Sequence, residues 1–162
     1  MVAMGGGVQY AFLRDGGMQI FKDASKAGAE YLLAHSKEMI GSKDMVPEGS
    51  AHITGAGKLQ AKQVIHAVSV GREGCTQRII SLATKNSLLL AKEKKLESIG
   101  FPTFGTGLYG VSMEDSVGAM SEEFAKHLRG DTTVGRIGLI LYGPEAYESA
   151  RAILDRKFRG SA

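Results

Sequence analysis

Three runs of apolar residues, each followed by a segment with helical periodicity, limit the folds open to this chain more than any other feature. The runs are QVIHAVSV at 63–70, SIGFPTF at 98–104 and RIGLILY at 136–142. Runs of this length and composition are typical of buried strands. Strands that alternate with long helices predict an α/β layered fold in which most strands are parallel.

The helical segments that follow these runs have recognisable ends and apolar faces. A helix is expected over 76–95, a second begins where Ser112 and Asp115 form a variant of the capping box, and Pro144 suits the first turn of a third. The positions expected on the buried faces are Ile79, Leu82, Ala83, Asn86, Leu89 and Leu90, then Val117, Met120, Phe124 and Leu128, then Tyr147, Ala150, Ile153 and Leu154.

The first third of the chain is richer in glycine. It predicts a short helix over 8–14 that ends at the Gly16–Gly17 pair, and one or two helices over 20–40 with Gly28 as a possible interruption. A short strand is expected at 51–54. The predicted order is helix, strand, strand, helix, strand, helix, strand, helix.

Composition fits a single globular domain over residues 1–162, with 43% hydrophobic and 23% charged residues. The net charge of +3 and pI of about 9.0 leave two interpretations open. The excess favours a phosphate-rich ligand or a polyanion, or it is a solvated surface on which basic residues are interspersed with acids. No apolar run approaches the ~20 residues of a membrane span and no signal peptide is visible, so no membrane partner is expected.

Cys75 is the only cysteine in the chain, so no internal disulfide is expected. This is typical of a reducing compartment and predicts a cytoplasmic protein. No metal-ligand spacing surrounds Cys75 or the histidines, and neither a metal nor a cofactor is expected. A catalytic thiol would need a histidine partner, which the sequence does not place.

Two glycine-rich stretches precede helical segments: Gly5–Gly6–Gly7, and GTGLYG at 105–110. Glycines let backbone N–H groups approach a ligand closely, and successive N–H groups before a helix N-terminus suit phosphate. Two such loops would hold a diphosphate from both sides. Neither is a Walker loop, and the second lacks the acidic residue that follows a dinucleotide fingerprint. Each loop taken alone is also compatible with a simple tight turn.

The chain resembles the macro domain family, which binds ADP-ribose. Three segments carry the resemblance in the family's order: GGGVQYAFLRDGG, GSAHITGAGKLQAKQVIHAVSV and FPTFGTGLYGV. It extends from Gly5 to about Leu154 and implies a three-layer α-β-α sandwich with a mixed, mostly parallel sheet.

The resemblance also implies a set of binding residues. Those before the first helix would lie along the distal ribose and diphosphate, those of the second loop would wrap the same groups from the other side, and an aromatic ring after the last strand would lie over the adenine. In this order they are Gly5, Gly6, Gly7 and Val8, then Gly105, Thr106, Gly107, Leu108, Tyr109 and Gly110, then Tyr142.

The chain departs from the family's pattern at its start. The family has roughly thirty residues before the first loop, with a Gly-Asp-Ile-Thr turn and an inner strand ending in Asn-Ala-Ala-Asn, and neither motif occurs here. The expectation is an N-terminally truncated macro-like domain. Three explanations stand: an internal start, strands supplied by another chain in a homo-oligomer that completes the sheet, or a rearranged sheet with 1–4 as a stub strand.

Three functions follow from these features. The first is a module that binds ADP-ribose or ADP-ribosylated protein. The second is a hydrolase of ADP-ribose conjugates, although the family's catalytic Asn is absent and the catalytic residues are unknown. The third is a nucleic-acid binder, which rests on the basic pI. His66 is expected to be structural rather than part of the site, and Glu114 and Asp115 to complement a helix N-terminus rather than act on a water.

Overall fold

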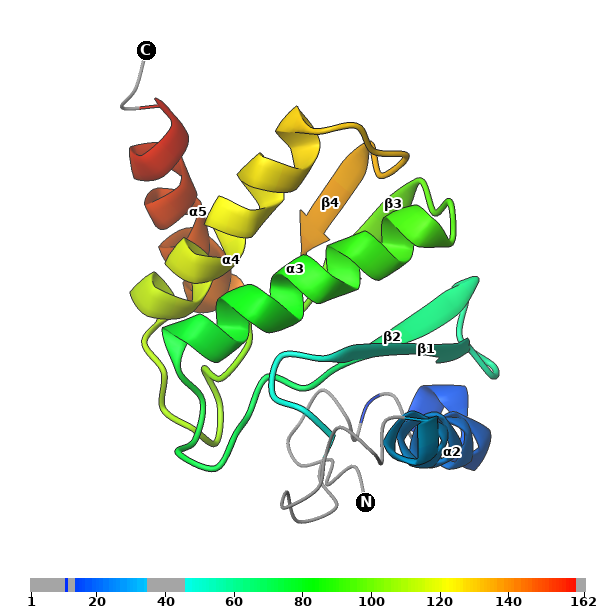
Figure 1. Ribbon diagram of the computed structural model, residues 1–162. Helices are drawn as coiled ribbons and strands as arrows, with labels where there is room; N and C mark the ends of the chain where they lie inside the picture. The colour runs from blue at the N-terminus through cyan, green and yellow to red at the C-terminus, as the bar shows by residue number, and fades with distance from the viewer. Residues whose placement is uncertain (1–10, 12–13, 35–45, 160–162) are drawn as a thin grey trace.

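The computed structural model describes residues 11, 14–34 and 46–159 (Figure 1). In this part the order of helices and strands is the predicted one. β2, β3 and β4 are shorter than the apolar runs that contain them, and β1 extends one residue beyond the strand expected at 51–54. The elements are α2 (Met18–Ala34), β1 (Ala51–Gly55), β2 (Gln63–Ala67), α3 (Gln77–Glu93), β3 (Ser98–Phe101), α4 (Met113–Arg129), β4 (Arg136–Leu139) and α5 (Pro144–Arg159).

The helix expected over 8–14 lies mainly outside the described residues, as does the segment 35–45. Helix α2 begins after Gly17, whose φ of 82° interrupts the preceding helical residues. It runs through Gly28 without a break, so the expected interruption does not occur. No helix in the described part is long and apolar enough to cross a membrane.

The four described strands form two separate pairs rather than one sheet. β1 and β2 are antiparallel, and β3 and β4 are parallel. The sequence predicts a single mixed, mostly parallel sheet, and among the described residues this is not observed. The reason is that β2 and β3 do not pair with each other, although one helix covers both pairs.

Helices cover both faces of the β1–β2 hairpin. Thr54 lies opposite Val64 in the register, so their side chains share one face, where Val64 packs against Ile20 of α2. Helix α3 packs against both strands as well, and Figure 1 shows it on the side opposite α2. The hairpin is therefore the middle layer of a local three-layer arrangement.

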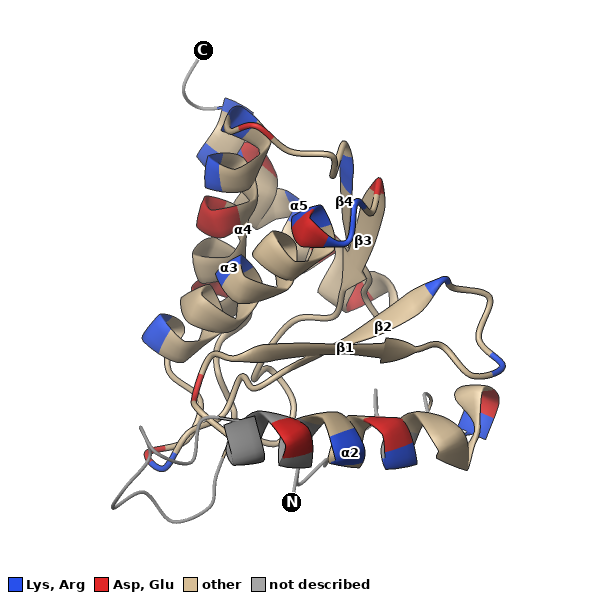
Figure 2. Cartoon of the chain, turned by 45° about the vertical axis from the view of Figure 1, so that its right-hand side comes forward, with Lys and Arg blue, Asp and Glu red and all other residues tan. Residues whose placement is uncertain are grey.

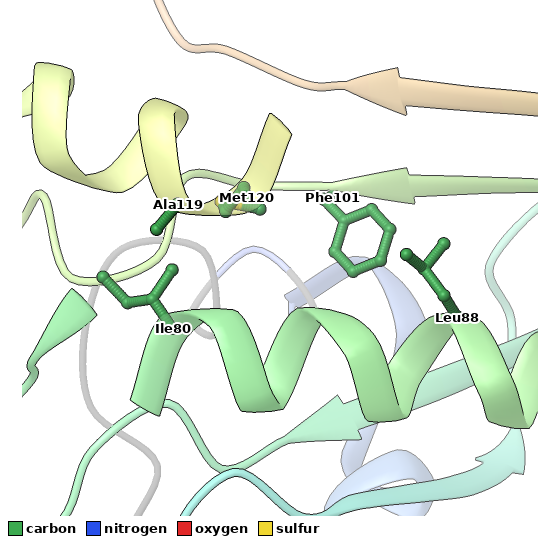
Figure 3. Packing of buried hydrophobic residues seen from close by; sticks show 5 residues of the cluster. All are labelled: Ile80, Leu88, Phe101, Ala119 and Met120. Atoms are coloured by element: carbon green, nitrogen blue, oxygen red, sulfur yellow. The ribbon is translucent and has the colours of Figure 1, made fainter. Parts of the chain in front are cut away.

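Helix α3 also contributes to the main core, which it shares with β3 and α4 (Figure 3). Phe101, at the end of β3, is its largest side chain. Its ring meets Phe104 edge-on at 6.0 Å and Phe124 at 5.2 Å between centroids. Such aromatic pairs add stabilisation beyond their buried area. The buried members of the cluster are Ile80, Leu88, Phe101, Ala119 and Met120.

The apolar face predicted for α3 is partly wrong. Ile79 and Ala83 are buried, but Leu89 is 48% exposed, and Leu82, Asn86 and Leu90 are only partly buried. The cause is that α3 packs against the hairpin and against α4, so its buried arc is wider than one stripe. The arc adds Ile80, Thr84, Ser87, Leu88 and Ala91.

The predicted apolar faces of α4 and α5 are each wrong at one position. Leu128 and Tyr147 are exposed, because α4 packs on α3 and α5 along a middle stretch and Tyr147 lies in the first turn of α5. The expected helix starts are confirmed. Ser112 caps α4 by accepting a hydrogen bond from the Asp115 N–H at 3.0 Å, and Pro144 opens α5.

Truncating Phe101 tests the main core. The substitution Phe101→Ala removes a ring that contacts α3, α4 and the residues after β3, and we expect it to lower the free energy of unfolding by ~3–5 kcal/mol. Phe158→Ala on α5 is the matched control, since this ring is 47% exposed and we expect a loss of less than about 1 kcal/mol. Urea denaturation measures both, and equal losses would contradict the assigned core.

Candidate ligand-binding site

The second glycine loop lies between the end of β3 and the start of α4. Gly105 and Gly110 have φ values of 78° and 63°, in the region that disfavours residues with a Cβ. The Val111 N–H donates to the Gly105 carbonyl at 3.1 Å, and the Gly110 N–H donates to the Gly107 carbonyl at 3.1 Å. The glycines thus close a compact loop in the conformation that the GTGLYG spacing favours.

The residues enclosed by these two hydrogen bonds carry the backbone N–H groups that are candidates for binding a ligand. Among the described residues, the N–H groups of 106–109 have no hydrogen-bond acceptor. The side chains of Leu108 and Tyr109 are exposed rather than folded back over the loop. Four consecutive amides without acceptors in the described part, shortly before a helix N-terminus, are the kind of donor set that suits anions.

Side chains behind the loop hold it in place. The Thr103 and Thr106 hydroxyls are hydrogen-bonded at 2.8 Å, and the Ser116 hydroxyl of α4 donates to the Phe104 carbonyl at 2.7 Å. Gly105 packs so closely on the Cys75 thiol that a Cβ there would lie 2.5 Å from the sulfur. Sequence reasoning missed these supports, since only the fold brings 75 and 116 to the loop.

Cys75 itself is part of this support. The thiol is half-buried, and burial raises its pKa above the ordinary value, so the sulfur is protonated at neutral pH. A protonated, partly buried thiol is a poor nucleophile. The described part of the chain contains no group of three or more His, Cys, Asp and Glu side chains that could hold a metal ion.

Tyr142 lies beyond the end of β4, at the same edge of the parallel pair as the loop. Phe101 and Leu139 are register partners, and the Ile140 N–H donates to the Phe101 carbonyl at 2.7 Å, so both strands end together. The Tyr142 side chain is fully exposed. Gly143 follows with a φ of 86° and turns the chain into α5. The ring is thus available to a flat ligand.

The four predicted residues of the first loop, Gly5, Gly6, Gly7 and Val8, lie outside the described residues. The described part of the candidate site therefore consists of the loop 105–110 and Tyr142, at the carboxyl ends of β3 and β4. In sheets with parallel strands, this edge is where ligands bind.

The acidic residues at the start of α4 are engaged elsewhere. Asp115 accepts a hydrogen bond from the Gln77 side chain at 2.6 Å, and Glu114 pairs with Arg156 of α5. Both lie in the first turn of α4, where carboxylates favour the helix dipole. These contacts support the structural interpretation of both residues.

His66 has structural contacts, as expected. It faces His52 across the β1–β2 ladder, and its Nε2 lies 2.8 Å from the Thr54 hydroxyl. Burial lowers the pKa of both imidazoles, and the charge of His52 further lowers the pKa of His66, against an opposing effect of Asp23. The pair lies on the face of the hairpin that packs on α2.

Basic and acidic residues are interspersed along the helices and loops of the described part (Figure 2). Arg78 pairs with Glu48 at 2.9 Å, and Lys157 pairs with Glu122 at 2.9 Å. These ion pairs favour the second interpretation of the net charge, a solvated surface, because the two charges within each pair neutralise each other.

The described part of the chain thus has an α/β fold in which a glycine loop lies at the carboxyl ends of a parallel strand pair. The chain belongs to the macro domain family, which it matches over residues 1–120.

Similar proteins agree with this assignment. An uncharacterised protein of Pyrobaculum aerophilum is 34% identical over 161 residues, covering 96% of this chain and 79% of the relative. An O-acetyl-ADP-ribose deacetylase of Klebsiella pneumoniae is 37% identical over 94 residues, covering 56% of this chain and 54% of the relative. A mutant of the Oceanobacillus iheyensis macrodomain, solved with ADPR, has a TM-score of 0.76 at 23% identity and covers 96% of this chain and 80% of its own. The macrodomain-like α/β fold thus extends over nearly the whole chain.

The histidine pair predicts a pH dependence of stability. Because the folded-state pKa of His66 lies below its ordinary value of 6.5, the unfolded chain takes up a proton first as the pH falls. The contribution of His66 to the free energy of unfolding is therefore fully present above about pH 6.5 and decreases below it. We expect the free energy of unfolding to fall between about pH 7 and pH 5, and to fall less in His66→Gln, which keeps a polar group near Thr54. Denaturation at several pH values measures this, and identical pH profiles would contradict it.

Proposed function

We propose that this domain binds ADP-ribose, free or linked to a protein, at the carboxyl ends of β3 and β4. The observation that carries the proposal is the run of four amides at 106–109 that have no acceptor among the described residues, in a chain of the macro domain family. A diphosphate is the part of ADP-ribose that such a donor set suits, because hydrogen bonds to ionised acceptors are stronger than neutral ones.

The neighbouring side chains support the other parts of the ligand. The Thr106 hydroxyl and the exposed Tyr109 ring flank the donor set and suit the distal ribose. Tyr142 offers a fully exposed ring to the adenine. The proposal assigns Gly5, Gly6, Gly7 and Val8 to the opposite side of the ribose and diphosphate, on the strength of the resemblance.

Gly107 provides a test of the donor set. Its φ is not positive and a Cβ there meets no atom within 4 Å, so Gly107→Val places its side chain in open space and leaves the fold intact. The same side chain would keep phosphate oxygens from the amides, and we expect ADP-ribose to bind about 10- to 100-fold more weakly. Calorimetric titration measures this, with AMP and ribose 5-phosphate as comparison ligands.

Gly135→Val is the matched control. A Cβ added at Gly135 also meets no atom within 4 Å, and this residue lies before β4, at the other end of the strand pair. We expect wild-type affinity from this variant. Equal affinities of the two valine variants would refute the role of the loop.

Tyr142 provides a test of the adenine position. Tyr142→Ala should weaken ADP-ribose about 5- to 150-fold, as expected for the ~1–3 kcal/mol of a stacked base, and leave the melting temperature unchanged because the side chain is fully exposed. Tyr147→Ala, also exposed but on α5, should change neither. If ribose 5-phosphate loses as much affinity as ADP-ribose in Tyr142→Ala, the ring does not contact the adenine.

A second candidate function is the hydrolysis of ADP-ribose conjugates. The similarity to the Klebsiella pneumoniae deacetylase favours it. In this mechanism the amides of the loop would stabilise negative charge that develops during attack by water. We expect a hydrolase to release ADP-ribose from O-acetyl-ADP-ribose faster than the uncatalysed rate, with Gly107→Val reducing the rate. If a sample that binds ADP-ribose releases it no faster than the control without protein, the hydrolase function is refuted and only the binding function remains.

A further inference from the structure

Glu48 lies shortly before β1, and its carboxylate contacts two groups that come 24 and 30 residues later in the chain. One carboxylate oxygen accepts a hydrogen bond from the Arg72 backbone N–H at 3.0 Å, and the other pairs with the Arg78 guanidinium at 2.9 Å. Hydrogen bonds to an ionised acceptor are stronger than those between neutral groups. The carboxylate therefore holds the backbone at Arg72 as well as the first turns of α3.

The turn that Glu48 contacts, 71–74, is closed and closely packed. Gly71 and Gly74 exchange two backbone hydrogen bonds, of 2.8 and 3.2 Å, and Gly74 has a φ of 93°. A Cβ at Gly71 would clash with the Glu48 carboxylate. Glycine at this position therefore lets the carboxylate reach the Arg72 N–H.

Glu48 is itself fixed through the residue that follows it. The Gly49 N–H donates to the Val68 carbonyl at 2.8 Å, and the Asn86 side chain of α3 donates to the Gly49 carbonyl at 2.7 Å. Gly49 is buried, and a Cβ there would lie 2.5 Å from the Leu82 side chain. The carboxylate therefore projects from a backbone position that α3 and the end of β2 define.

The turn 71–74 leads directly to the support of the glycine loop. Cys75 follows Gly74, and Gly105 of the loop packs on its thiol. Thr76 then caps α3 by accepting a hydrogen bond from the Ile79 N–H at 3.3 Å. Figure 1 shows the connection from β2 to α3 beside the connection from β3 to α4. The thiol under the loop thus lies between the clamped turn and the start of a helix.

We propose that Glu48 is a positioning residue for the ligand-binding loop 105–110. Its carboxylate holds the turn 71–74, and through Cys75 this turn sets where Gly105 and the amides after it lie. The inference rests on the proposed function, because it takes these amides to bind the diphosphate. A donor set binds tightly when its geometry is fixed before the ligand arrives, so a loosened turn lowers the affinity without the loss of an amide.

The thiol reports on this position by itself, since Cys75 is the only cysteine in the chain. We expect Glu48→Ala to raise the rate at which dithionitrobenzoate modifies the half-buried thiol by about five- to tenfold, because the turn before it opens more often. The NMR signals of the amides of 106–109 should shift, and calorimetric titration should show ADP-ribose binding about fivefold or more weakly.

A conservative variant and a matched control accompany this substitution. Glu48→Gln keeps an oxygen that can accept from the Arg72 N–H and loses the charge that pairs with Arg78, so its thiol rate and affinity should lie between those of Glu48→Ala and the wild type. Glu122→Ala removes a carboxylate that also pairs with a basic side chain at 2.9 Å, that of Lys157, but lies on α4. This control should change neither the thiol rate, the loop amides nor the affinity.

Two results would overturn the proposal. One is that Glu48→Ala, or Glu48→Gln if the alanine variant does not fold by urea denaturation, has the thiol rate and loop amide shifts of the wild type. The other is a raised thiol rate with wild-type affinity for ADP-ribose, since the turn would then not position the site. If the wild type itself does not bind ADP-ribose, the proposed function fails, and the thiol rate and amide shifts decide whether Glu48 positions the loop.

Discussion

The packing of α3 against both strand pairs is the contact on which the rest of the structure depends. One side of the helix covers the β1–β2 hairpin, and Ile80 and Leu88 contact Phe101 at the end of β3. No described backbone hydrogen bond joins the two pairs. The hydrophobic contacts of one helix therefore hold together strands that in a continuous sheet would be joined by their backbones.

The same contact positions the candidate site. Phe101 is the last residue of β3, and the loop 105–110 begins four residues later, so a fixed strand end gives the loop a fixed origin. Behind the loop, Cys75 precedes α3 and Ser116 lies in the first turns of α4. Because the two helices pack on one another and on Phe101, the core and the amides of the loop form one unit.

Local features of the sequence were sufficient to predict elements that depend on local physics. Gly105 and Gly110 were expected to shape a loop because they adopt backbone conformations that other residues avoid, and Ser112 was expected to cap α4. Hydrophobic periodicity gave a wrong burial for Leu89, which is exposed. The reason is that periodicity does not show on how many sides a helix packs against its neighbours. Likewise, the support of the loop by Cys75 and the division into two strand pairs arise from contacts between residues distant in the sequence.

The most direct measurement is an NMR titration of the full chain with ADP-ribose, in which the backbone amides are followed individually. The account predicts saturable shifts that are largest for the amides of 106–109, with smaller shifts at Tyr142 and none in the α5 residues far from the strand ends. Saturable binding whose shifts fall elsewhere, for example between α3 and α4, or the absence of any shift at millimolar ligand, would contradict it.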